Sequence, residues 1–156
     1  PNKYIRIGVT GAFLSIFLLA IYFGRYAGLG TNLIHASFYG EQIYLYDWVL
    51  KLVFTIITLA AGFQGGEVTP LFSIGASLGV VLSGVFGLPV EFVAALGYAA
   101  VFGSATNTML APIFIGGEVF GFANIPYFAL VCMVAFVINR NSSIYAGQKL
   151  YAKEQA

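Results

Sequence analysis

The sequence predicts an all-α membrane protein with tilted and discontinuous transmembrane helices. Of its 156 residues, 60% are hydrophobic and 8% are charged, whereas soluble domains average about 25% charged residues. Its mean hydropathy is +0.90, and charges stand at the ends of apolar runs that glycines interrupt. Because lipid removes the need for a polar exterior, this composition fits a chain embedded in a bilayer. Glycine-broken apolar runs are typical of discontinuous helices whose ends meet a substrate.

The first three apolar segments differ in length. Residues 7–23 are about long enough to cross a bilayer, which takes roughly 20 residues. Residues 26–40 are shorter and contain glycines, so we expect them to enter the membrane without crossing it. Residues 48–61 are predicted to form a helix after a loop at the membrane interface. Within that helix, Lys51 is expected to extend its ammonium group to the lipid headgroups.

The later segments are almost free of charge. Residues 68–90 carry none, and Gly75, Gly79 and Gly84 leave small faces at which neighbouring helices can approach closely. The remaining predicted segments are 92–117, expected to break at Pro112; 126–138, a clean apolar helix; and 142–156, a short final helix that runs from the membrane into water.

Net charge, cysteine content and domain organisation limit the possible functions. The net charge is +1, so nothing indicates a nucleic-acid partner, which needs a dense basic patch. Cys132 is the sole cysteine, and we expect it to be a small buried residue on a helix. Residues 1–156 contain no flexible linker and are interpreted as one domain or part of one. Because the chain opens with Pro1 and shows no signal peptide, we expect it to be a piece of a longer protein.

The most informative stretch is 62–72, with the sequence Gly-Phe-Gln-Gly-Gly-Glu-Val-Thr-Pro-Leu-Phe. One predicted helix ends at its glycines, and the next begins with Thr69 at the N-cap and Pro70 in the first turn. The unpaired N–H groups of a helix N-terminus favour anions. Glu67 is a carboxyl group in apolar sequence, and such a group is a functional candidate by default. The stretch therefore predicts an anion site, with a tight turn between packed helices as the alternative.

Residues 62–72 and the Ser-Ile-Gly-Ala-Ser-Leu-Gly stretch at 73–79 resemble the CLC family of chloride channels and proton-coupled anion antiporters. That family carries a Gly-Gly-x-Phe-x-Pro motif followed by a Gly-Ala/Thr-x-x-Gly helix. The resemblance continues through Ala-Pro at 111–112 and Ser-Ser-Ile-Tyr at 142–145. It implies that residues 1–156 are the C-terminal half of a CLC-type transmembrane domain, the second of two inverted repeats. Gly-Gly-Glu-Val-Thr-Pro resembles the fluoride/proton antiporter branch.

The resemblance also implies roles and partners. The anion-binding residues would be Gly66, Glu67, Val68, Thr69 and Tyr145, with hydroxyls from the last two and coupling or gating by Glu67. The implied partners are a fluoride or chloride ion, protons, the lipid bilayer of the cell membrane, the N-terminal half absent from this chain, and a second copy in a homodimer. The dimer contacts would lie partly on 112–120 and 127–136. No cofactor or metal is expected.

Two alternatives to proton-coupled fluoride export stay open. One is a chloride channel or chloride/proton antiporter of the same family. The other is a membrane-integral enzyme or assembly subunit that pairs Glu67 with Glu118, although the chain shows no nucleophile–base pair or metal-ligand cluster. The sequence leaves Glu118 between a family role and pairing at a helix end. Asn107 and Thr108 are expected to hold helices together, and His35 is expected to be structural.

Overall fold

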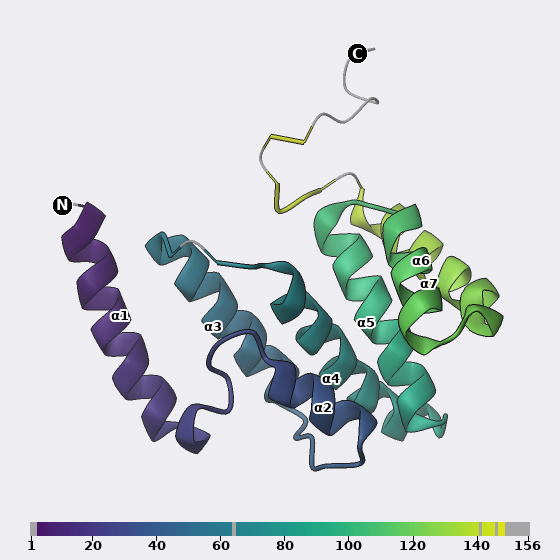
Figure 1. Ribbon diagram of the computed structural model, residues 1–156, viewed down its shortest axis with the longest axis horizontal. Helices are drawn as coiled ribbons and strands as arrows, with labels where there is room; N and C mark the ends of the chain where they lie inside the picture. Colours follow the sequence, from purple (N-terminus) through teal and green to yellow (C-terminus); the bar gives the residue numbers. More distant parts are fainter. Residues whose placement is uncertain (1–2, 64, 141, 146, 149–156) are drawn as a thin grey trace.

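Helices joined by turns make up the part of the chain that the structure describes (Figure 1). The structure is a computed structural model, and it describes residues 3–63, 65–140, 142–145 and 147–148. These residues contain no strand, which confirms the all-α prediction. The helices are α1 (Lys3–Ala20), α2 (Thr31–Phe38), α3 (Asp47–Ala61), α4 (Val68–Phe86), α5 (Val90–Thr106), α6 (Leu110–Phe120) and α7 (Ile125–Asn139), with single 3-10 turns η1 (Tyr22–Gly24) and η2 (Phe122–Asn124).

The helices are arranged in series across the molecule. Figure 1 shows α1 at one end, α3 beside it, α2 and α4 in the middle, and α5, α6 and α7 at the other end. By length and composition, Val68–Phe86 and Phe122–Asn139 are the two described helices able to cross a membrane. The eight residues of α2 span only about 12 Å at 1.5 Å per residue. This is much less than the roughly 30 Å of the hydrocarbon layer, so α2 is too short to cross it, in agreement with that part of the prediction.

The α4–α5 pair is held by contact between the two backbones. A methyl group on Gly75 would collide with the carbonyl group of Gly97, and one on Gly79 would lie 2.6 Å from Ala94 Cα. The two helices are antiparallel, since later residues of α4 meet earlier residues of α5. Close approach at Gly75 and Gly79 was predicted. The same prediction for Gly84 finds no support among the described residues, none of which lies within 4 Å of a methyl group placed there.

Apolar side chains fill the space between α5, α6 and α7. Cys132 is 1% exposed among Ala99, Ile113 and Phe128, which confirms the prediction of a small buried residue. Most of the outer surface of α7 is nevertheless apolar and exposed; its exposed large side chains are Tyr127, Leu130, Met133, Val134, Val137 and Ile138. An apolar surface of this kind suits lipid or another membrane helix.

The break in the 92–117 run lies earlier than predicted. Asn107 ends α5 in the left-handed conformation, with φ of 52°, and α6 begins at Leu110. Pro112 does not break the chain, because it lies in the first turn of α6, where no backbone N–H is needed. Asn107 and Asn139 form a hydrogen bond of 3.4 Å between the ends of α5 and α7. This contact confirms the predicted role of Asn107 in holding helices together.

The segment after α7 is not helical where the structure describes it. Ser143 Oγ donates to the carbonyl oxygen of Thr106 at 3.3 Å, and the Ile144 N–H donates to that of Ala105 at 2.9 Å. The predicted final helix is therefore wrong for the described residues up to 148, two of which bond to the end of α5 instead. Residues 149–156 lie outside the described part.

An ion pair with a buried carboxylate joins the segment after α1 to the beginning of α3. The Asp47 side chain is 0% exposed. It accepts hydrogen bonds from Arg25 Nη2 at 2.7 Å, the Tyr26 hydroxyl at 2.6 Å and the Tyr44 N–H at 2.9 Å. Arg25 Nη2 also donates to the Gln42 carbonyl oxygen at 2.6 Å. The hydrogen bond to Asp47 raises the pKa of the Arg25 guanidinium, which therefore stays charged.

Replacing Arg25 with glutamine is expected to lower the free energy of unfolding by about 3 kcal/mol, because Asp47 would remain buried without its cation. Denaturant titration in mild detergent measures the effect. The matched control is Glu41→Gln, which breaks the exposed His35–Glu41 pair of 3.2 Å and should cost less than about 1 kcal/mol. Equal losses in the two variants would show that burial of the Arg25–Asp47 pair does not matter.

Candidate functional site

The turn between α3 and α4 places the N-terminus of a helix directly after a glycine-rich segment. Gly62 ends α3 with φ of 97°, a left-handed conformation that glycine adopts without strain. The N-cap of α4 is Glu67 and not Thr69, which corrects the prediction; Thr69 and Pro70 lie in the first turn. A helix leaves its first N–H groups without acceptors inside the helix. In α4 these groups belong to Val68 and Thr69, because Pro70 has no N–H.

The Glu67 carboxylate has no partner among the residues that the structure describes. It is half-buried and makes no hydrogen bond or ion pair with any residue that the structure describes. The neighbouring Thr69 is half-buried, and Val68 is 36% exposed. A free carboxylate at the positive end of a helix is stabilised by the helix dipole. In its ionised form it would also compete with a dissolved anion for the same N–H groups.

Tyr145 lies at the same end of the α4–α5 pair as the α4 N-terminus. Because α4 and α5 are antiparallel, the beginning of α4 lies level with the end of α5. The bond between Ile144 and Ala105 attaches the 142–145 segment to that end. The Tyr145 side chain is 43% exposed there. The structure therefore places Thr69 and Tyr145, the two predicted hydroxyl donors, at the same end of the α4–α5 pair.

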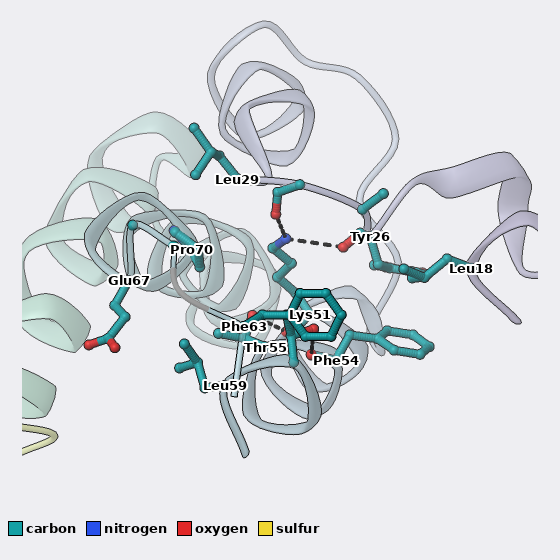
Figure 2. A pocket seen from close by; sticks show the side chains of 15 residues that line it. Leu18, Tyr26, Leu29, Lys51, Phe54, Thr55, Leu59, Phe63, Glu67 and Pro70 are labelled. Atoms are coloured by element: carbon teal, nitrogen blue, oxygen red, sulfur yellow. Dashed lines mark hydrogen bonds between the residues drawn. The ribbon is translucent and has the colours of Figure 1, made fainter. Parts of the chain in front are cut away.

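A cavity of about 290 Å³ lies beside the turn (Figure 2). Of the predicted site residues, Gly66 and Glu67 line it, whereas Val68, Thr69 and Tyr145 do not. The cavity is formed by α1, the segment after η1, α3 and the 63–70 turn; its lining residues are Leu18, Tyr26, Ala27, Gly28, Leu29, Lys51, Phe54, Thr55, Thr58, Leu59, Phe63, Gly65, Gly66, Glu67 and Pro70.

Lys51 is the cavity residue that the sequence prediction placed wrongly. Instead of reaching lipid headgroups, its side chain is buried, with 2% of the residue exposed. Its Nζ donates to the carbonyl oxygens of Tyr26 at 3.1 Å and Gly28 at 2.6 Å. These carbonyl groups lie more than 20 residues earlier in the chain, so sequence spacing did not reveal them. The available signal was a lysine in an apolar helix, which is a functional candidate by default.

The remaining candidates lie outside this region. Glu118 is exposed near the end of α6, whose backbone does not approach that of α4, so it does not pair with Glu67 as the enzyme alternative required. Glu118 also makes no hydrogen bond or ion pair within the described part of the chain, so pairing at the helix end is absent there. His35 contacts Glu41 and stacks on Tyr39. No cluster of three potential metal ligands occurs among the described residues.

The helices that begin and end inside the apolar part of this chain define an integral membrane protein of the discontinuous-helix class. A model of the voltage gated chloride channel family matches residues 1–140. The chain therefore belongs to the voltage gated chloride channel family, known as CLC.

Two similar proteins narrow the comparison. The chain is 41% identical over 126 residues to a chloride/fluoride channel protein from Pseudomonas syringae pv. tomato (strain ATCC BAA-871 / DC3000), a match that covers 81% of this chain and 28% of the relative. It also matches the crystal structure of a CLC-type fluoride/proton antiporter with 62% identity and a TM-score of 0.92, over 96% of this chain and 38% of that chain. The chain thus spans well under half the length of either protein.

Proposed function

We propose that the full-length protein containing this chain exports fluoride across the cell membrane in exchange for protons, as a transporter and not an enzyme. The observation that supports this most is the unpartnered Glu67 at the N-terminus of α4, within the residues that the structure describes. It lies in a chain 62% identical to a protein described as a CLC-type fluoride/proton antiporter. In this proposal, residues 1–156 supply the C-terminal half of the transport domain, and the missing N-terminal half supplies the rest of the ion path.

The proposed site combines backbone and hydroxyl donors. Fluoride is small and strongly hydrated, so losing water requires close, strong donors, and the N–H groups at Gly66, Val68 and Thr69 and the hydroxyls of Thr69 and Tyr145 are of that kind. Ionised Glu67 repels a nearby anion, whereas protonated Glu67 donates a hydrogen bond to it. A nearby anion favours the protonated form of a carboxyl group over the ionised form. Anion occupancy would thereby be linked to proton binding.

The same proposal includes a homodimer with contacts on 112–120 and 127–136. Its support is the exposed apolar side chains of Phe114 and Val119 on α6 and of Leu130 and Met133 on α7. Cysteines placed on these faces should cross-link between copies in a native-like bilayer. Monomeric behaviour there would contradict the dimer.

Flux through the unmodified full-length protein in liposomes tests the ion assignment. We expect fluoride efflux that exceeds chloride efflux and that drives, or is driven by, a proton gradient. A chloride channel is the second candidate, because the Pseudomonas syringae relative is named a chloride/fluoride channel protein. Chloride flux equal to fluoride flux would exclude the fluoride assignment, and flux without proton movement would favour the channel.

Replacing Thr69 with valine is expected to weaken fluoride binding by about 1 to 3 kcal/mol, the usual cost of leaving a buried site short of one donor. Fluoride titration calorimetry on the full-length protein measures this change. Thr10→Val is the control, because Thr10 lies on α1, whose backbone does not approach that of α4. If both valine variants bind fluoride as the unmodified protein does, then Thr69 does not contact the ion.

A further inference from the structure

Lys51 is a buried cation without a carboxylate partner among the described residues, whose ion pairs are Arg25–Asp47 and His35–Glu41. An ammonium group has three donors, and the Lys51 Nζ gives two of them to the carbonyl oxygens of Tyr26 and Gly28. Carbonyl groups supply hydrogen bonds but no balancing charge. A buried charge left without a counter-charge is costly, so this position favours an anion nearby.

The surroundings hold the ammonium at the cavity wall. Gly30 lies directly against the Lys51 stem with φ of 80°, and a methyl group there would lie 2.7 Å from Lys51 Cε and 2.5 Å from Ser73 Oγ. The stem is therefore confined between the Gly30 backbone and α3. Figure 2 shows the Lys51 side chain among the lining residues and the Glu67 carboxylate extending away from it.

Part of the cavity lining belongs to the turn before α4. This part includes Gly65 and Gly66, and much of the remaining lining is apolar, including Phe54, Leu59 and Phe63. Charges interact more strongly beside apolar walls than in water. An anion attracted by Lys51 would lie in the cavity that borders Gly66 and Glu67 without occupying the α4 N-terminus itself.

We propose that Lys51 makes this cavity a holding site for one small monovalent inorganic anion, next to the α4 turn and separate from the site at Val68 and Thr69. The identity of that anion as fluoride rests on the proposed function. The holding site itself rests on the buried ammonium group, the cavity and the part of its lining that belongs to the turn before α4. It would raise the local concentration of the transported ion before the ion reaches Glu67.

The test places a cysteine in the cavity and measures its reaction with charged thiol reagents. Thr58 lines the cavity on α3, and its hydroxyl bonds only to its own helix, to the Phe54 carbonyl oxygen at 2.7 Å, among the described residues. In full-length Thr58→Cys protein, an anionic methanethiosulfonate should react faster than a cationic one of similar size. Adding Lys51→Met should lower this rate ratio about tenfold, the lower end of charge-focusing effects in clefts. Adding Lys51→Arg should preserve the ratio.

Protection by sodium fluoride, compared with sodium gluconate, gives a second measurement. Fluoride should slow the anionic reagent when Lys51 is present and should have no such effect in the Lys51→Met protein. If Lys51→Met does not fold, fluoride protection measured in the Thr58→Cys protein that retains Lys51 decides whether the cavity holds the anion. Protein without Thr58→Cys corrects for Cys132, which is buried.

An unchanged rate ratio in Lys51→Met would overturn the proposal and leave Lys51 as a clamp on the Tyr26 and Gly28 carbonyls. Failure of a neutral reagent to reach the thiol introduced by Thr58→Cys in the folded protein would overturn it as well, because the cavity would then be closed. Thiol labelling requires no transport. If Lys51→Met lowers the rate ratio but the unmodified protein shows no fluoride flux, the holding site is supported and the proposed fluoride transport is rejected.

Discussion

Replacing Glu67 with glutamine in the full-length protein is expected to abolish the proton dependence of fluoride transport, or transport itself, while the fold is kept. Glutamine preserves the shape and hydrogen-bonding capacity of the side chain but cannot titrate. Glu67 is half-buried at the N-cap of α4 and makes no bond that the fold would lose within the described residues. Fluoride flux from liposomes, with and without a proton gradient, measures the change.

The matched control for this substitution is Glu118→Gln, which alters an exposed glutamate near the end of α6. It should leave flux and coupling unchanged, because the backbone of α6 does not approach that of α4. Unchanged fluoride flux and proton dependence in Glu67→Gln would make Glu67 a structural residue and would reject the proposed coupling mechanism. Loss of folding, seen as aggregation during gel filtration, would also contradict the expectation.

Replacing Gly75 with alanine is expected to lower the free energy of unfolding by at least about 4 kcal/mol, at the upper end of single-residue effects. The new methyl group would lie 2.8 Å from Gly97 C and 3.0 Å from Tyr98 Cα. These are backbone atoms, so rotation of a side chain cannot relieve the contact, and α4 and α5 must separate. Denaturant titration in detergent and the yield of folded protein measure the loss.

Gly84→Ala is the control on the same helix. No residue that the structure describes lies within 4 Å of the methyl group that it would add, and alanine favours a helix by about 1 kcal/mol over glycine. We therefore expect unchanged or slightly increased stability. Equal losses at Gly75 and Gly84 would mean that glycine is needed for some property other than the α4–α5 approach.

The sequence by itself determined the position of most helices, because backbone groups in lipid must find partners within their own helix. The helix predicted at 48–61 is Asp47–Ala61, and the helix predicted at 126–138 is Ile125–Asn139. The motif at 62–72 also indicated where α3 ends and α4 begins, since its glycines permit the turn at Gly62. These signals are local, so they can be recognised without knowing which segments pack together.

Only the tertiary structure decided which residues meet. Lys51 is bonded to carbonyl groups 25 and 23 residues earlier, and Asp47 is paired with a cation 22 residues earlier. Gly75 and Gly84 are alike in sequence, but one contacts the backbone of α5 and no described residue lies within 4 Å of a methyl group placed on the other. Whether a charge is buried or a glycine is required depends on what a distant segment places against it, and spacing along one chain carries little information about that.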